Sequence, residues 1–259
     1  MSQCKDAVLP SLKTGTTQGI AVDTKTNKVF FGNDKEQTVV VLDRKTFGKV
    51  GEIPVTGPVD DVAYDRKNGM IYADHDDGTE VWVINPNTLK ITASVTIGEA
   101  PEYVAYDPTS DRLYQNIKSA SIVQVINPDT NRAEATWDTA PVDGPHGLAL
   151  DRQTQHLFTA GKNGELAEID MKTGKVIASV DIARGVDQIA FDRSNKRIYC
   201  ACSGVISVAE ETDDGLKSPG DVPTPKGSHT LAIDPRDHSV WTCCFDRNSS
   251  YFKQYKVQR

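Results

Sequence analysis

Apolar and polar residues alternate along this chain in short segments that return at a nearly constant interval. An aspartate preceded two residues earlier by alanine and followed seven residues later by an aromatic residue occurs six times, at Asp23, Asp65, Asp107, Asp151, Asp192 and Asp234. Successive aspartates are 41 to 44 residues apart, and no copy contains a helical stripe of apolar residues. A repeat of this length built from short strands is typical of β-propeller blades.

Each repeat predicts an antiparallel blade of four strands. The first strand is almost continuously apolar, as in 147–150, which predicts burial on both faces. Its alanine suggests a close approach between blades, and the aspartate that ends it can hold a tight turn by accepting bonds from backbone N–H groups. The aromatic residue of the second strand is expected to pack between blades. A third apolar strand and a more polar outer strand complete the unit.

The sequence therefore predicts one all-β domain over residues 1–259, a six-bladed β-propeller. The repeats begin near residues 16, 58, 100, 144, 185 and 227. The last repeat is one strand short, whereas residues 7–15 match 50–57 of the first repeat. We therefore expect residues 1–15 to form the outer strand of the last blade and to close the ring, which would remove exposed strand edges.

Charge and hydropathy narrow the classes of partner. There are 29 Lys and Arg against 36 Asp and Glu, a formal net charge of -7, and no basic run. Nucleic acid is an unfavourable partner for such a surface. No segment approaches the roughly 20 apolar residues of a membrane span, and the start of the chain lacks the apolar core of a secretory signal. We expect a soluble protein, either cytoplasmic or secreted with its signal removed.

One position of the repeat carries varied polar residues. Five residues before the repeat aspartates, the six copies have Gln18, Asp60, Glu102, His146, Asp187 and His229. In a propeller this position faces the axial channel at one mouth, so the six side chains are expected to form a ring. The second strands end near the same mouth, which adds His75. The remaining two histidines, His156 and His238, lie in the turn after the innermost strand, at the opposite face, and are interpreted as solvated.

The ring allows three interpretations. A water-filled channel could simply require polar side chains. Alternatively Glu102, His146, Asp187 and His229 could bind one divalent metal ion such as Zn, Mn, Fe or Ni, with open positions for substrate. The same four residues could also exchange protons without a metal, because histidines and carboxylates that share a site shift each other's pKa values. In either catalytic case Gln18, Asp60 and His75 would position the substrate.

The cysteines leave further alternatives open. Cys200, Cys202, Cys243 and Cys244 lie on the second strands of the last two repeats, with Cys202 expected beside Cys244. Their spacing does not match a zinc knuckle. They are interpreted as small buried residues, with a disulfide or a soft-metal site as alternatives.

The segments 101–107, 145–151, 186–192 and 81–88 resemble the YVTN-type β-propeller repeat family. This resemblance implies a propeller fold, although members of the family are commonly seven-bladed. Similar propellers include lactone hydrolases and streptogramin-type lyases, which use a metal at the channel mouth. They also include six-bladed fungal cyclases of natural-product pathways, which guide cyclisations such as hetero-Diels–Alder reactions without a metal. The likeness to these enzymes is one of architecture alone.

The leading prediction is a small-molecule enzyme with its active site at the channel mouth, acting by elimination, lactone opening or cyclisation. Glu102, His146, Asp187 and His229 would be the catalytic residues. One alternative is a metal-free natural-product cyclase or pericyclase that works by orienting its substrate. Another is a binding or scaffold propeller without catalysis. The expected partner is a small-molecule substrate, not nucleic acid and not a membrane.

Overall fold

The computed structural model describes residues 16–245 and 250–256, which fold almost entirely as antiparallel strands. The strands form six sheets in which sequential strands are neighbours, so each sheet is one blade. Five blades have four strands and the last has three among the described residues. This confirms the all-β fold class and the six blades of a β-propeller. The closing strand predicted for residues 1–15 lies outside the described residues.

The strands group into two compact units, 1–96 and 97–259. The first unit holds blades 1 and 2. Blade 1 comprises β1 (Thr17–Asp23), β2 (Lys28–Asn33), β3 (Thr38–Asp43) and β4 (Lys49–Pro54). Blade 2 comprises β5 (Val59–Tyr64), β6 (Ile71–His75), β7 (Glu80–Asn85) and β8 (Lys90–Thr96). Phe30, Val41, Ile71 and Trp82 are among the buried residues that pack the two blades together.

The second unit holds blades 3 to 6. Blade 3 comprises β9 (Pro101–Asp107), β10 (Arg112–Ile117), β11 (Ile122–Asn127) and β12 (Arg132–Asp138), with a short 3-10 turn at Lys118–Ala120. Blade 4 comprises β13 (Pro145–Asp151), β14 (His156–Gly161), β15 (Glu165–Asp170) and β16 (Lys175–Asp181). Blade 5 comprises β17 (Gln188–Asp192), β18 (Arg197–Ala201), β19 (Val205–Thr212) and β20 (Gly215–Pro223). Blade 6 comprises β21 (Leu231–Asp234), β22 (Ser239–Phe245) and β23 (Ser250–Tyr255).

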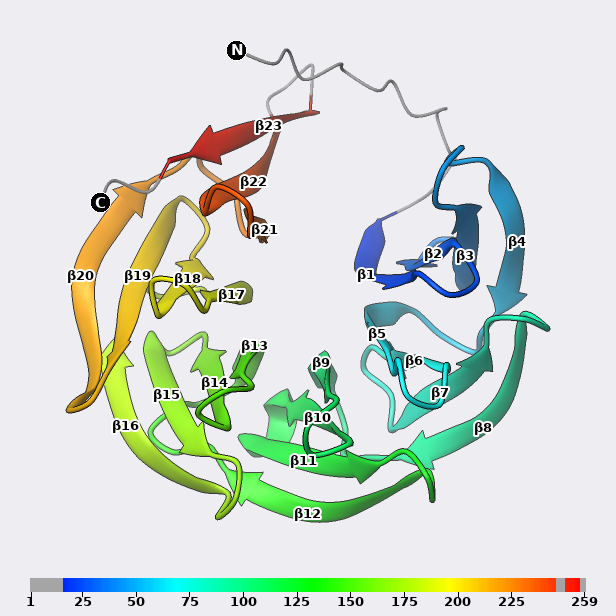
Figure 1. The fold of residues 1–259 in the computed structure, drawn as a ribbon, viewed down its shortest axis with the longest axis horizontal. Coiled ribbons are helices and arrows are strands. Elements are labelled where there is room, and N and C mark those ends of the chain that lie inside the picture. The colour runs from blue at the N-terminus through cyan, green and yellow to red at the C-terminus, as the bar shows by residue number, and fades with distance from the viewer. Residues whose placement is uncertain (1–15, 246–249, 257–259) are drawn as a thin grey trace. The chain divides into compact units, whose positions relative to one another are not determined.

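Within each blade of the second unit the chain runs from an innermost to an outermost strand. Figure 1 shows this for β9 to β12, β13 to β16 and β17 to β20, coloured green to orange. The predicted aromatic packing residues are buried in five blades, as Phe30, Tyr72, Tyr114, Phe158 and Tyr199, whereas Trp241 is half-buried. β1 departs from the expected burial, because Ile20 and Val22 on one of its faces are exposed. The described residues contain no helix that could cross a membrane.

Two glycines allow innermost strands of neighbouring blades to approach each other closely. A Cβ on Gly19 would lie 2.5 Å from Asp61 Cα in the neighbouring strand β5. In the second unit, a Cβ on Gly147 would lie 2.8 Å from Ile189 N in β17. Both contacts are far inside van der Waals distance, so only glycine permits these backbones to meet. Both glycines stand four residues before their repeat aspartate, next to the varied polar position.

The repeat aspartates hold their turns as the sequence predicts. Each side chain accepts a bond of 2.7 to 3.1 Å from the backbone N–H two residues further on: Asp23 from Lys25, Asp65 from Lys67, Asp107 from Thr109, Asp151 from Gln153, Asp192 from Ser194 and Asp234 from Arg236. Asp107 also accepts bonds from Ser110 N and Ser110 Oγ. These bonds explain why every copy needs the aspartate without a catalytic role.

We expect Asp107→Asn to lower the free energy of unfolding by about 1–3 kcal/mol at pH 7. In wild type, Thr109 and Ser110 donate to both carboxylate oxygens of Asp107, whereas the asparagine amide has only one oxygen that accepts. Burial alone would raise the pKa of Asp107, yet the bonds from Ser110 and Thr109 hold it below its usual value. A lowered pKa stabilises the fold above the unfolded-state pKa of about 3.9, and this contribution is lost as the pH falls. The difference from wild type in urea unfolding should therefore shrink below about pH 4.

The matched control is Asp129→Asn in the exposed turn between β11 and β12. It should leave the unfolding free energy within about 0.5 kcal/mol of wild type at every pH, as surface substitutions usually do. Equal effects of the two substitutions would show that the carboxylate of Asp107 does not hold its turn.

Candidate functional site

The innermost strands of the second unit meet at the ends where the varied polar residues lie. Gln188 Nε2 donates to Tyr103 Oη at 2.6 Å, and Leu231 N donates to Gln188 Oε1 at 2.7 Å. One amide thus joins blades 3, 5 and 6, although blade 4 separates blades 3 and 5 along the chain. Tyr103 and Gln188 directly follow Glu102 and Asp187. These bonds bring the innermost strands of blades 3, 5 and 6 together near the varied polar residues, whereas a common ring of all six stays a prediction.

Glu102 and His146 form the first of two carboxylate–imidazole pairs among the four residues predicted to be catalytic. His146 Nε2 lies 3.2 Å from Glu102 Oε1, and His146 Nδ1 lies 2.9 Å from the carbonyl oxygen of Gly144. Lys118 binds the same oxygen of Glu102 through an ion pair. His146 is only 2 % exposed, which fixes its ring between these partners.

The hydrogen-bond partners of His146 determine which of its ring nitrogens carries a hydrogen. A carbonyl oxygen only accepts, so the Gly144 contact requires a hydrogen on Nδ1. Nε2 then faces the Glu102 carboxylate, and a hydrogen bond between the two needs a second proton. Burial lowers the pKa of His146 below its usual value, while the charge of Glu102 opposes this shift. The lowered pKa favours the neutral ring, whose Nε2 lone pair then faces the Glu102 carboxylate beside the ammonium group of Lys118.

Asn116 positions the backbone that carries His146. Its Nδ2 donates to the carbonyl oxygens of His146 at 2.8 Å and of Gly147 at 3.1 Å. Thr159 Oγ1 in turn donates to Asn116 Oδ1 at 3.1 Å. Asn116 is fully buried on β10, so blade 3 sets the start of β13 in blade 4.

Asp187 and His229 form the second pair. His229 Nδ1 lies 2.8 Å from Asp187 Oδ2, so Nδ1 carries the hydrogen and neutral His229 keeps its lone pair on Nε2. Both side chains are nearly half exposed. The bond to Asp187 raises the pKa of His229, against a smaller effect of burial. For Asp187, burial raises the pKa, but the bond and charge of His229 lower it overall.

Two lysines that the sequence reasoning missed place positive charge beside these pairs. Lys162 is exposed, and its charge lowers the pKa of both His146 and Asp187. Lys118 also lowers the pKa of His146 and is bound to Glu102. Both lysines stand eleven residues after a repeat aspartate, one residue beyond the position that yielded His75. Extending the repeat comparison by one residue would have found them.

The predicted substrate-binding residues lie in the first unit. Gln18 on β1 and Asp60 on β5 are half-buried near the starts of their strands, where the Asp60 N–H bonds Asp74 Oδ1 at 3.2 Å. Asp34 follows β2 and has a raised pKa, because of burial and the nearby charge of Asp76. In the first unit, Asp34 and Asp76 occupy the repeat position that Lys118 and Lys162 occupy in the second unit. A substrate contact for Gln18, Asp60 and His75 stays a prediction.

His75 is packed within blade 2. Its ring stacks on Trp82 with centroids 4.9 Å apart and an interplanar angle of 25°. A Cβ on Gly57 would fall 1.9 Å from His75 Nε2, and one on Gly78 would fall 2.3 Å from His75 Cγ. Neighbouring backbone and Trp82 thus hold the ring closely in place.

The interpretation of the two turn histidines as solvated is wrong. His238 lies 3.0 Å from Asp192 Oδ2 and 2.8 Å from Ser194 Oγ, which links the turns of blades 5 and 6. His156 contacts two buried glutamates, Glu168 and Glu211. The contacts of His238 with Asp192 and of His156 with Glu211 join different blades, so the pattern within one repeat does not reveal them. The four described cysteines are free thiols, buried except for half-buried Cys243, which rules out a disulfide among them.

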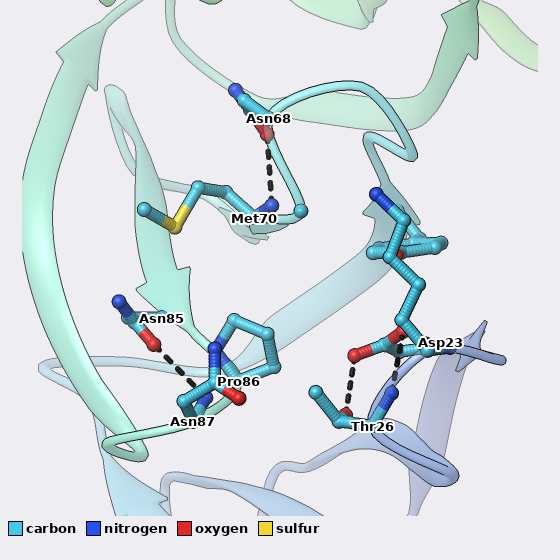
Figure 2. A pocket seen from close by; sticks show the side chains of 10 residues that line it. Asp23, Thr26, Asn68, Met70, Asn85, Pro86 and Asn87 are labelled. Atoms are coloured by element: carbon cyan, nitrogen blue, oxygen red, sulfur yellow. Dashed lines mark hydrogen bonds between the residues drawn. The ribbon is translucent and has the colours of Figure 1, made fainter.

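Two hollows formed by the described residues are lined by other side chains than those predicted for the site. A hollow of about 360 Å³ in the first unit is lined by turn residues of blades 1 and 2. Figure 2 shows its polar side chains engaged in their own turns: Asn68 with Met70 N, Asn85 with Asn87 N, and Asp23 with Thr26. A second hollow of about 330 Å³ lies against Tyr199, Ile206 and Val240 in blades 5 and 6.

Comparison with known proteins supports the fold alone. No protein family matches the chain, and no curated protein matches by sequence, so membership of the YVTN-type family stays a prediction. A chain of the mitotic checkpoint complex superposes with a TM-score of 0.79 at 14% identity, covering 93% of this chain and 74% of that one. Hydrazine synthase of Kuenenia stuttgartiensis superposes with a TM-score of 0.67 at 11% identity, covering 98% and 99%. These propeller neighbours include a synthase and a member of a checkpoint assembly, so the fold does not decide between catalysis and scaffolding.

We expect the Asp187–His229 bond to be visible in the titration of the His229 imidazole. Its pKa, measured by NMR of the ring carbons, should lie above 6.5 in wild type and fall in Asp187→Asn, which removes the partner charge. A raised histidine pKa contributes stability below the unfolded-state value, and this contribution is lost as the pH rises through the folded-state pKa.

His146 provides the internal comparison, because its pKa is lowered by burial and not raised. It should titrate below His229 in the same spectra. An unchanged His229 titration in Asp187→Asn would show that the two side chains are not bonded in solution.

Proposed function

We propose that the protein is an enzyme that transfers protons to and from a small organic molecule, with His229 as the general base. The supporting observation is the Asp187–His229 pair, with Nδ1 bonded to a carboxylate at 2.8 Å and a half-exposed ring. This bond orients the imidazole and fixes the tautomer whose Nε2 accepts a proton. A carboxylate that orients a histidine in this way is a recurrent feature of general-base catalysis.

Lys162 supplies the complementary charge. Removal of a proton from a carbon beside a carbonyl group, or from a water that attacks one, leaves negative charge on oxygen. The ammonium group of Lys162 is exposed and acts electrostatically on both His146 and Asp187. A cation near the reacting groups would stabilise a developing oxyanion.

The Glu102–His146 pair supplies a second proton position. His146 Nε2 and Glu102 Oε1 are 3.2 Å apart and Lys118 binds the same carboxylate. In the form in which a proton is shared between His146 Nε2 and Glu102 Oε1, the pair would give this proton to a leaving oxygen while His229 keeps the one it has taken. A base on blade 6 and an acid pair on blades 3 and 4 fit elimination or lactone opening, because both reactions remove one proton and deliver another.

A divalent metal bound by Glu102, His146, Asp187 and His229 stays a prediction. The proposed reaction uses these residues as two hydrogen-bonded pairs and as proton carriers.

The experiment is a turnover assay on a panel of five- and six-membered lactones and of β-hydroxy and β-alkoxy carbonyl compounds. On any substrate found, His229→Asn is expected to lower kcat/KM by about 10²–10⁴-fold, the usual contribution of a positioned general base. Lys162→Ala should lower kcat more than it raises KM, because its charge acts on the transition state.

The matched control is His238→Asn. His238 also lies on blade 6 and is bonded to an aspartate of blade 5, but at the other end of the strands. It should leave kcat/KM within about threefold of wild type. Similar rates in His229→Asn and wild type would refute the proposed base. Binding of panel compounds without turnover would instead support a non-catalytic binding propeller.

A further inference from the structure

A second group of titratable residues lies between blades 4 and 5, apart from the proposed active site. His156 begins β14, Glu168 lies on β15 of the same blade, and Glu211 lies on β19 of the next. His156 pairs with Asp151 at the end of β13, whereas His146 stands near the beginning of that strand. The two sites therefore occupy opposite ends of blade 4.

The three side chains point toward one another. His156 Nδ1 lies 2.6 Å from Glu168 Oε1 and 2.9 Å from Glu211 Oε1. One ligand atom of each residue lies within 4.8 Å of the others, and this is the only set of three or more such ligands found among residues 16–245 and 250–256. Thr154 Oγ1 also contacts Glu211 Oε1 at 3.1 Å.

Burial makes the group electrostatically unusual. Glu168 is 2 % exposed and Glu211 is 4 % exposed, so two carboxylates share one poorly solvated place. Burial raises the pKa of Glu168; His156 opposes this shift and Glu211 adds to it. Glu211 Oε2 is buried and has no hydrogen-bond partner within the described part of the chain. Buried carboxylate oxygens normally require a donor or a cation.

The charge of His156 alone does not balance this group. Two ionised carboxylates carry two negative charges, and one imidazolium neutralises one of them. Asp170 adds a further negative charge nearby; the backbone bond from Lys172 lowers its pKa most, and the charge of His156 lowers it further. A divalent cation would neutralise both glutamates and leave His156 neutral, with its Nδ1 lone pair available as a ligand.

We propose that His156, Glu168 and Glu211 bind one divalent transition-metal ion, which links β14 and β15 of blade 4 to β19 of blade 5. One imidazole nitrogen and two carboxylate oxygens suit Zn²⁺, Mn²⁺ or Fe²⁺, whereas Ca²⁺ and Mg²⁺ prefer oxygen ligands alone. Three protein ligands leave room for water, and His156 is 25 % exposed, so the site has access to solvent. Because the ligands come from two blades, the ion stabilises their packing.

The test uses the full chain freed of metal by a chelator and then titrated with ZnCl₂ or MnCl₂ in a calorimeter. Wild type is expected to bind one equivalent of each ion and to unfold at a higher temperature when loaded, since a ligand that binds only the native state stabilises it. Protein loaded with Co²⁺ should lack thiolate charge-transfer absorption, which excludes the free cysteines as the ligands.

Glu168→Gln and Glu211→Gln are each expected to weaken metal binding at least tenfold and to abolish the metal-dependent rise in unfolding temperature. Without metal, both variants should be at least as stable as wild type, because a buried negative charge has been removed. This sign separates lost binding from damaged folding.

Two controls locate the site. Glu210 is the neighbour of Glu211 and pairs with Arg197, so Glu210→Gln should leave metal affinity within about twofold of wild type. His229→Asn should do the same, which distinguishes this site from the residues of the proposed reaction. Failure of wild type to bind one equivalent, or unchanged affinity in both Glu168→Gln and Glu211→Gln, would overturn the proposal.

Discussion

The close packing of innermost strands is the constraint on which the site of the second unit depends. Gly147 lets the backbone of β13 approach Ile189 of β17, at a distance that any side chain would prevent. This contact brings the start of β13, where His146 lies, close to the start of β17, where Asp187 and Gln188 lie. Gln188 reaches Tyr103 and Leu231, and the carboxylates and imidazoles that precede them form pairs across blade boundaries. Interactions between blades, and not within them, therefore create the chemistry.

Repetition made the fold predictable. The alanine, aspartate and aromatic residue recur because each performs the same task in every copy. The bonds of Asp23, Asp65 and Asp107 to the N–H groups of their own turns illustrate this uniformity. Because these residues act within their own turn or strand, the same residue types recur in each copy, and six blades could be counted from the sequence. The position of Glu102, His146, Asp187 and His229 at the strand entrances followed from the same register.

The pairing of these side chains could not be predicted, because it depends on contacts between copies. The register shows that His229 and Asp187 occupy equivalent positions, but not that Nδ1 of one contacts Oδ2 of the other. Lys162 was missed because it is one residue beyond the positions compared. His156 was misinterpreted for a physical reason: its partner Glu211 lies in another blade, and burial of that glutamate has no signature in a single repeat.

The amide of Gln188 has a consequence for how this protein could evolve or be redesigned. Its single side chain serves three blades, and no other copy has glutamine at that place, where Gly19, Asp61, Tyr103, Gly147 and Thr230 stand instead. The copies are thus not interchangeable, even though each contains the same aspartate-held turn. Exchanging or deleting repeats, or replacing them by a consensus repeat, would keep the strands of each blade. It would remove the bonds of Gln188 to Tyr103 and Leu231, which only this combination of repeats provides.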